Sequence, residues 1–326
     1  MDNQNNWYPI SLIGKLKKSP QRLILQGCPI VVYKGKSGWV VQKDSCPHRN
    51  YPLSAGKVIN NELRCKYHGW RFDDKGFTTE IPGLKSHYKG KCAVLTTYSS
   101  HEHNGLLWVC LKPGTPFQLA AKPLPDRKIY SYRTTIKGDT ADILENFLDP
   151  MHTSFLHDGL IRKSTKVNKT IAEIRAIKNG VQVKYTEESH QSGIIGSVFG
   201  RFITHSYGIL SKGNIIDLEF YSKKGLEMTN RFIIVPTKPG ENYFFSQITA
   251  NNRWVPSWLK IGMLTPFFYM ALQQDKKAVE LLSANKKQVE LDPLQSTYLD
   301  IMRRYIDRML NGEAFNVTEK DIELYL

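Results

Sequence analysis

The feature that most constrains this chain is a pair of short loops that each carry one cysteine and one histidine. The first loop reads Cys-Pro-His at residues 46–48, and the second reads Cys-Lys-Tyr-His at residues 65–68. Each can hold a thiolate and an imidazole on one tight turn, and two such loops can close around a metal centre. The fold must therefore bring the loops together. The four candidate ligands are Cys46, His48, Cys65 and His68.

The chemistry of this ligand set leaves two alternatives. A structural zinc site also takes two cysteines and two histidines at close spacing. A [2Fe-2S] cluster with mixed ligation instead needs both cysteines on one iron and both histidines on the other, which raises the reduction potential of the cluster. Because each loop supplies one ligand of each kind, we interpret the loops as a [2Fe-2S] site and keep zinc as the alternative.

The residues around the ligands, Cys-Pro-His-Arg and Cys-Lys-Tyr-His-Gly-Trp, closely resemble the Rieske motif of bacterial oxygenases and their ferredoxins. Respiratory Rieske proteins carry an additional cysteine in each loop for a disulfide, and these loops contain none. The departure points away from the respiratory branch. The remaining cysteines, Cys28, Cys92 and Cys110, fall in predicted strands, where we interpret them as small buried residues.

A second group of candidate ligands lies within residues 145–157. Two histidines and one carboxylate leave positions open on ferrous iron, which suits the binding of dioxygen beside a substrate. His152 and His157 would supply the imidazoles. Their spacing does not suit a straight helix and Pro150 lacks an amide donor, so we expect a local distortion. Taken singly, each histidine could be an ordinary polar residue.

The pattern Asn-x-x-Asp-x-x-His-x-x-x-x-His in this segment resembles the mononuclear-iron motif of the Rieske oxygenase family. The family takes its third ligand from a helix far downstream, which the resemblance places at Asp275; Glu280 is the competitor, and an ordinary solvated helix face is the plain alternative. Further residues beside these ligands are candidates for supporting the site or lining a pocket, with core packing as their alternative: Asn146, Phe147, Phe155 and Leu156.

Asp149, three residues before His152, could form only a local pair or cap. The family resemblance implies more, because the equivalent aspartate hydrogen-bonds an iron-ligating histidine and the second Rieske histidine of a neighbouring subunit. Here those residues are His152 and His68. Electrons would then cross between protomers, which implies a ring, expected to be a homotrimer, and Asp149 would be a catalytic residue.

Two regions separate along the chain. Short strands with frequent turns run to about Pro116, a proline-rich connector follows, and longer strands then lead into a helical C-terminal part. The fold class is therefore α+β, and the resemblance makes residues 1–116 an all-β Rieske [2Fe-2S] domain and residues 117–326 an antiparallel-sheet, helix-grip-like catalytic domain. The predicted strands are Leu23–Tyr33, Gly38–Gln42, Val58–Arg64, Cys92–Tyr98, Gly105–Leu111, Ile129–Lys137, Ile171–Lys178, Val181–Thr186, Ile203–Leu210, Ile215–Tyr221, Leu226–Val235 and Tyr243–Ala250; the predicted helices are Phe267–Lys287 and Tyr298–Leu310.

Charge and hydropathy limit the partners. The net charge of +15 is concentrated before Lys122 in a region without a nucleic-acid motif, and we interpret it as a basic face for an acidic electron donor. The apolar stretch Ile261–Leu272 is too short to span a bilayer and predicts a buried helix, with an interfacial helix as the alternative. The first residues lack a signal peptide, which predicts a cytoplasmic protein.

The layout is similar to that of the vanillate and dicamba O-demethylase and ketosteroid hydroxylase oxygenases. It implies a terminal oxygenase with one [2Fe-2S] cluster and one mononuclear Fe(II) per subunit, which hydroxylates or demethylates a small apolar or aromatic molecule with dioxygen. No dinucleotide loop occurs, so NAD(P)H would act through a separate reductase, with or without an acidic ferredoxin. The alternatives are a Rieske electron-transfer protein without oxygenase activity and a zinc-stabilised basic binding protein.

Overall fold

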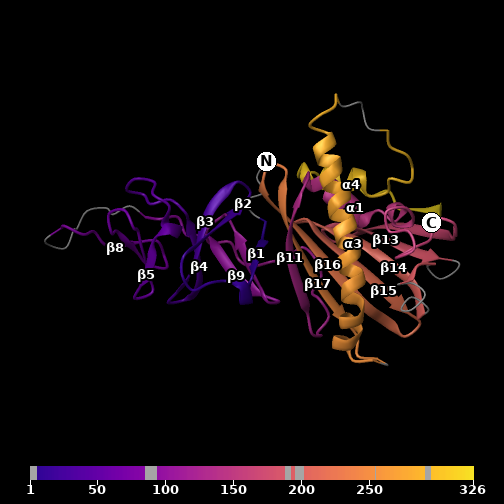
Figure 1. Ribbon diagram of the computed structural model, residues 1–326, viewed down its shortest axis with the longest axis horizontal. Helices are drawn as coiled ribbons and strands as arrows, with labels where there is room; N and C mark the ends of the chain where they lie inside the picture. Colours follow the sequence, from indigo (N-terminus) through magenta and orange to yellow (C-terminus); the bar gives the residue numbers. More distant parts are fainter. Residues whose placement is uncertain (1–5, 85–93, 188–191, 195–201, 254, 291–294) are drawn as a thin grey trace. The chain divides into compact units, whose positions relative to one another are not determined.

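The computed structural model divides the chain into two compact units, which are described separately (Figure 1). It describes residues 6–84, 94–187, 192–194, 202–253, 255–290 and 295–326. The first unit comprises Asp2–Gln118 with Val235–Pro239, and the second comprises Leu119–Ile234 and Gly240–Leu326. Within the described ranges, no helix is both long and apolar enough to cross a membrane.

The first unit is built from three small antiparallel sheets, which confirms the expected all-β architecture. Their strand orders are β1-β10-β9, β2-β3-β4 and β5-β6-β7-β8. The strands are β1 (Tyr8–Leu12), β2 (Gln21–Leu25), β3 (Cys28–Gly35), β4 (Gly38–Lys43), β5 (Lys57–Ile59), β6 (Glu62–Arg64), β7 (Arg71–Phe72), β8 (Thr78–Glu80), β9 (Ser99–His103) and β10 (Leu106–Cys110).

Three strand predictions in this unit need correction. The segment Val58–Arg64 is the hairpin of β5 and β6 rather than one strand, because Asn60 and Asn61 both adopt positive φ angles and reverse the chain. The segment Leu23–Tyr33 is a hairpin rather than one strand, because Gln26 and Gly27 both adopt positive φ angles and reverse the chain. The predicted strand Cys92–Tyr98 is wrong over its described part, residues 94–98. Its amides bond to separate partners, Leu95 to Gly76 and Tyr98 to Val41, so no continuous ladder forms. Cys92 lies outside the described residues.

The second unit contains one eight-stranded antiparallel sheet in the order β11-β17-β16-β15-β14-β13-β12-β18. The predicted turns at Asn179-Gly180, at residues 212–214 and at Pro239-Gly240 form its hairpins, and Asn179, Asn214 and Gly240 have positive φ angles. The strands are β11 (Tyr130–Lys137), β12 (Lys169–Ile177), β13 (Gly180–Glu187), β14 (Ile203–Ser211), β15 (Ile215–Ser222), β16 (Gly225–Lys238), β17 (Glu241–Ala250) and β18 (Lys320–Tyr325).

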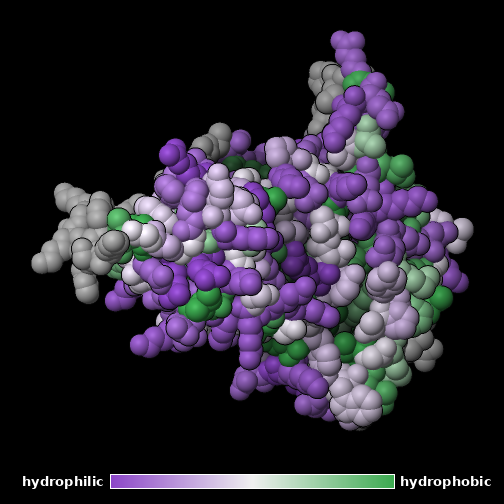
Figure 2. Space-filling view, turned by 60° about the vertical axis from the view of Figure 1, so that its left-hand side comes forward, coloured by the Kyte–Doolittle hydropathy of each residue, from purple (hydrophilic) through white to green (hydrophobic). Residues whose placement is uncertain are grey.

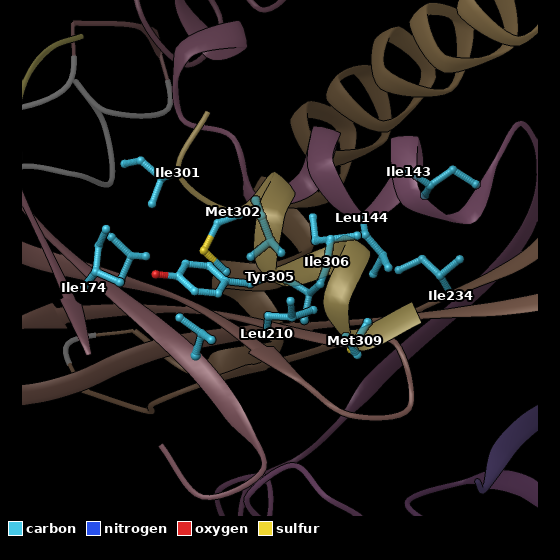
Figure 3. Packing of buried hydrophobic residues seen from close by; sticks show 14 of the residues in the cluster. Ile143, Leu144, Ile174, Leu210, Ile234, Ile301, Met302, Tyr305, Ile306 and Met309 are labelled. Carbon is cyan, nitrogen blue, oxygen red and sulfur yellow. The ribbon is translucent and has the colours of Figure 1, made fainter. Parts of the chain in front are cut away.

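In the described part of this unit, the helices α1 (Thr140–Leu148), α3 (Ser257–Asn285) and α4 (Arg303–Leu310) pack with the sheet. Alternate residues of each strand, such as Val181 and Val183 of β13, point into the core between sheet and helices. Figure 3 shows Leu144 of α1 beside Ile306 of α4 above the strands, and Ile143 and Tyr305 belong to the same core. The core therefore holds α1 firmly against the sheet.

The prediction that the apolar part of helix α3 is buried needs correction. The predicted helix at Phe267–Lys287 begins earlier, at Ser257, and runs across the unit in Figure 1. The stretch Ile261–Leu272 is only partly buried, because a sheet covers only one face of a helix that lies on it. Ile261 and Leu264 face inward, whereas Met263, Tyr269 and Met270 are exposed.

A buried ion pair offers a test of the sheet. Arg231 donates hydrogen bonds to both carboxylate oxygens of Asp217, at 2.7 and 2.9 Å, and to the carbonyl oxygen of Lys122; its side chain is 2% exposed and that of Asp217 is 1% exposed. We predict that Asp217→Leu lowers the free energy of unfolding by about 3–5 kcal/mol, because it strands a buried guanidinium. Urea denaturation followed by circular dichroism measures this change.

The matched control is the double variant Asp217→Leu/Arg231→Met. It removes both charges, so it should recover most of the lost free energy of unfolding. A double variant as unstable as Asp217→Leu alone would contradict the proposed cause.

Candidate metal centres

The two cysteine–histidine loops of the first unit have the same backbone hydrogen bonds. The amide of Cys46 donates to Tyr51 O, and the amide of Cys65 donates to Trp70 O, five residues on in each case. Each cysteine carbonyl in turn accepts the amide of the fourth residue on, Asn50 or Gly69, and both of these residues have positive φ angles. The sequence thus builds two equivalent tight loops from local bonds.

The loops bring all four predicted cluster ligands together. Cys46 and Cys65 are buried in the core of the unit and interact with each other. The ring of His48 lies 4.7 Å from that of His68 and stacks on Trp70 at 4.8 Å. Because His68 is exposed while the cysteines are buried, the site presents its histidine edge to the surface.

The donor set fits a [2Fe-2S] cluster. Nδ1 of His48 is buried and has no hydrogen-bond partner among the described residues, so this atom is available to a metal. Burial, with the neighbouring His68 and Arg49, lowers the pKa of His48 and keeps the imidazole neutral, as a ligand requires. Burial and the nearby Cys65 raise the pKa of the Cys46 thiol to about 11; a bound cation would reverse that effect.

In the second unit, α1 ends at Leu148 and the next residues form the short 3₁₀ helix Met151–Ser154. This break confirms the local distortion expected near Pro150. Asp149 holds it, because its Oδ1 accepts the amide of Met151 at 2.8 Å and its Oδ2 accepts the amide of His152 at 3.0 Å. The same Oδ2 lies 3.5 Å from Nδ1 of His152. Asp149 therefore acts as a cap and also contacts the imidazole.

His152, His157 and Asp275 converge although they come from separate elements. One ligand atom from each lies within 4.8 Å of the others. Nε2 of His157 is 3.0 Å and Nε2 of His152 is 3.4 Å from the same oxygen, Oδ1 of Asp275. Ligand atoms at right angles on an octahedral metal, each about 2.1 Å from the ion, lie roughly 3 Å apart. The three side chains thus fit one metal ion.

Two amide side chains orient these candidate ligands. Asn146 of α1 donates to Oδ1 of Asp275 at 2.8 Å. Nδ1 of His157 lies 2.7 Å from Oε1 of Gln274, an acceptor, so this nitrogen carries the proton and Nε2 is left for a metal. The glutamine neighbour of Asp275 thereby fixes the tautomer of a histidine on another element.

The charges at this site favour a bound cation. Burial lowers the pKa of His152, but Asp149 and Asp275 outweigh burial and raise it to about 9. Burial raises the pKa of Asp275, but hydrogen bonds with His152, His157 and Asn146 lower it by more, so the carboxylate stays ionised. A positive charge is thus stabilised where the three ligand atoms meet.

The other candidate site residues lie in different surroundings. Glu280 lies away from both histidines and accepts the amide of Lys137 at 3.3 Å, so it does not join the cluster. Phe147 stacks on Phe244 and lies tilted against Phe232 beside the core. Phe155 is 74% exposed, and Leu156 is partly buried. Asn146 hydrogen-bonds a ligand atom of the triad through its side chain, whereas the backbone amides of Phe155 and Leu156 donate to the carbonyl oxygen of His152.

Sequence reasoning missed Arg162, which stabilises the turn that carries His152. Its guanidinium donates to Pro150 O at 3.2 Å, to Thr153 Oγ1 at 2.8 Å and to Glu187 Oε1 at 2.5 Å, and the residue is 5% exposed. A single arginine with no motif around it gives no sequence signal for this role. Only the pairing of β13 with its neighbours brings Glu187 into reach.

Comparisons with known proteins agree with this geometry. Residues 6–99 match the Rieske [2Fe-2S] domain family. The chain is 33% identical over 170 residues to protein TIC 55, chloroplastic, of Arabidopsis thaliana, covering 48% of this chain and 31% of that protein. It is 34% identical over 170 residues to 4beta-methylsterol monooxygenase of Methylococcus capsulatus, covering 47% and 44%. The matches cover less than two thirds of the length of these relatives.

Solved structures share the fold over nearly the whole chain. The crystal structure of dicamba monooxygenase bound to dicamba superposes with a TM-score of 0.77 at 19% identity, covering 95% of this chain and 96% of that chain. NdmA of Pseudomonas putida with caffeine superposes with a TM-score of 0.75 at 20% identity, covering 94% and 90%. Residues 6–99 thus form a Rieske [2Fe-2S] domain, and the whole chain shares its α+β fold with these solved structures.

Proposed function

We propose that the chain is the terminal oxygenase component of a Rieske non-haem iron system, a mono- or dioxygenase that hydroxylates or oxidatively demethylates a small, largely apolar or aromatic substrate. The observation that carries the proposal is the convergence of His152, His157 and Asp275 in a chain that also has a Rieske domain. Residues 1–116 form the Rieske domain and residues 117–326 the catalytic domain. Relatives named as demethylases, hydroxylases and dioxygenases support this reaction class.

In this function Cys46, His48, Cys65 and His68 hold the cluster, and His152, His157 and Asp275 hold Fe(II). The cluster supplies single electrons, and the iron supplies dioxygen activation beside the substrate. The chain itself orients these groups: Gln274 accepts a hydrogen bond from Nδ1 of His157 and so turns Nε2 toward Asp275, and Asn146 fixes the carboxylate of Asp275. Phe147, Phe155 and Leu156 are not assigned to a substrate pocket by any contact among the described residues.

Electrons come from a separate NAD(P)H-dependent reductase, with or without an acidic ferredoxin. The exposed histidine edge of the Rieske loops is flanked by the exposed cations Arg49 and Lys66, which suits an acidic donor. A homotrimer, in which His68 of one protomer reaches Asp149 of the next, is supported by the position of Asp149. Its side chain is 31% exposed and lines a surface cavity with Glu145 and Arg303. A cytoplasmic location remains a prediction from the sequence.

The first test concerns the third iron ligand. Asp275→Ala should lower the affinity for mononuclear iron at least about 100-fold and abolish product formation, because it removes a ligand, whereas the Rieske absorbance should persist. Metal analysis, the visible spectrum and ¹⁸O incorporation from ¹⁸O₂ measure the three effects. Glu280→Ala, on the same helix, is the matched control and should keep its iron. If Glu280→Ala lost its mononuclear iron and Asp275→Ala kept it, the third iron ligand would be Glu280 instead of Asp275.

The second test concerns the cluster. The purified protein should contain labile sulfide, and His48→Cys should lower the reduction potential of the cluster, because a thiolate gives iron more electron density than an imidazole does. Spectroelectrochemical titration measures the potential. A colourless protein with stoichiometric zinc would favour the zinc alternative, and an unchanged potential in an assembled cluster would remove His48 from the ligand set.

The third test concerns electron transfer between protomers. Asp149→Ala should retain both metals yet slow the oxidation of the reduced Rieske cluster by dioxygen, and Asp149→Asn should show whether the charge is needed. In mixed trimers, Cys46→Ala subunits lack the cluster and His152→Ala subunits lack the iron. An equal mixture should recover roughly one quarter of wild-type activity, because one interface in four joins an intact cluster to an intact iron. No recovery in verified, loaded mixed trimers would disprove the route.

A further inference from the structure

The N-terminal half of α3 exposes an apolar stripe that the proposed oxygenase function does not use. Between Trp258 and Met270 the helix carries a single charge, Lys260. Trp258 is 61% exposed and Tyr269 is 53% exposed. The stripe consists of Trp258, Leu259, Met263, Pro266, Tyr269 and Met270, all of which are exposed. Figure 2 shows mainly hydrophilic residues on the face that it presents, with smaller hydrophobic areas among them.

The stripe lies on one side of the helix. At about 100° per residue its six members fall within an arc of roughly 140°. The buried residues Ile261, Leu264 and Ala271 fall on the opposite side, toward the sheet. The helix is therefore apolar on both sides over its first turns. Such a helix needs a second apolar environment outside the one that its own unit supplies.

Cations gather at the same end of α3. We call the group Arg127, Lys223, Lys224, Arg253 and Lys260 the basic rim. Glu227 connects several of its members: its side chain accepts Ser222 Oγ from the turn that carries the two lysines, and it pairs with Arg253 at 3.3 Å.

The rim continues onto the helix. Lys260 donates to the carbonyl and side-chain oxygens of Asn251, whose own amide side chain donates to Glu227. Arg127 donates to Leu226 O at 3.3 Å. Glu227 thus pairs directly with Arg253 and is linked to Lys260 through Asn251, while Arg127 bonds the preceding residue, Leu226. Asp126 and Lys128, which flank Arg127, offset each other.

We propose that the stripe and the basic rim together dock the protein on an anionic phospholipid bilayer. Exposed Trp and Tyr rings prefer the interface between headgroups and acyl chains, and Leu and Met side chains enter its apolar edge. Lys and Arg beside such a helix bind lipid phosphates with their charged ends and cover the apolar boundary with their methylene stems. The helix would lie flat on the surface, because its inner face is held by the sheet.

The net charge of the chain favours an anionic bilayer, rather than a second copy of the chain, as the partner of the stripe and the basic rim. Each copy has a net charge of +15, so a contact that includes the rim would bring like charges together. An anionic surface satisfies the cations and the apolar stripe at once. This inference uses only exposure and charge, so it stands or falls independently of the oxygenase activity.

The test uses the full-length holoprotein and vesicles of phosphatidylglycerol and phosphatidylcholine in equal amounts, with pure phosphatidylcholine vesicles as reference. Sedimentation should show binding to the anionic vesicles that weakens as sodium chloride is added. Lys223→Gln/Lys224→Gln should weaken binding about 25-fold, since each cation contributes about fivefold. Trp258→Ser/Met263→Ser should weaken it at least about tenfold while iron content and the Rieske spectrum stay unchanged.

Matched controls come from a loop outside the stripe and rim. Lys163→Gln/Lys166→Gln removes the same charge from exposed lysines, and Val167→Ser removes an exposed apolar side chain; neither should change vesicle binding. Absence of binding to anionic vesicles at low salt, or equal losses in the controls, would overturn the proposal. Dissociation of the oligomer by Trp258→Ser/Met263→Ser with unchanged vesicle binding, seen by analytical ultracentrifugation, would make the stripe a contact between copies and would also overturn it.

Discussion

A single carboxylate oxygen, Oδ1 of Asp275, holds together the segments that form the candidate iron site. It accepts the amide of Asn146 on α1 and lies against the imidazoles of His152 and His157, which follow that helix. A buried carboxylate is costly unless its oxygens are hydrogen-bonded or paired with positive charge. The neighbours of Asp275 meet that cost, and in doing so they fix α3 against α1. The position of α3 across the sheet is therefore a requirement of the site as well as of the core.

The two candidate metal centres depend on the tertiary fold to different extents. Each Rieske loop positions its own cysteine and histidine through two local backbone hydrogen bonds, so the fold needs only to bring the loop after β4 to the hairpin loop between β6 and β7. The second centre needs the end of α1, the turn capped by Asp149 and a residue of α3. It also needs Arg162 to tie that turn to β13 through Glu187. A displaced sheet would therefore disturb the second centre before the first.

This difference explains what could be predicted from sequence. The four candidate cluster ligands could be named from their residue types and spacing, and the hairpins at Asn179-Gly180 and at residues 212–214 followed from turn chemistry. Asp275 could be named only through a family resemblance, because no local pattern links it to His157. Gln274 and Arg162 act through contacts that only the tertiary fold creates. The edge strand β18 pairs with β12, a distant partner that periodicity cannot reveal.

The burial of α3 was mispredicted for a related reason. Hydropathy over Ile261–Leu272 reports how apolar the residues are, but it cannot report how many faces of a helix the rest of the chain will cover. The sheet covers one face, and the remaining apolar side chains stay outside. Charge has the same limit, because a net charge of +15 does not show which residues lie beside each cation in the folded protein. Arg49 and Lys66 border an exposed histidine edge, whereas the basic rim borders an apolar stripe. Cations beside an exposed histidine edge suit the binding of an acidic redox protein, whereas cations beside an apolar stripe suit the binding of a lipid surface. The role of a lysine or arginine therefore depends on the residues around it.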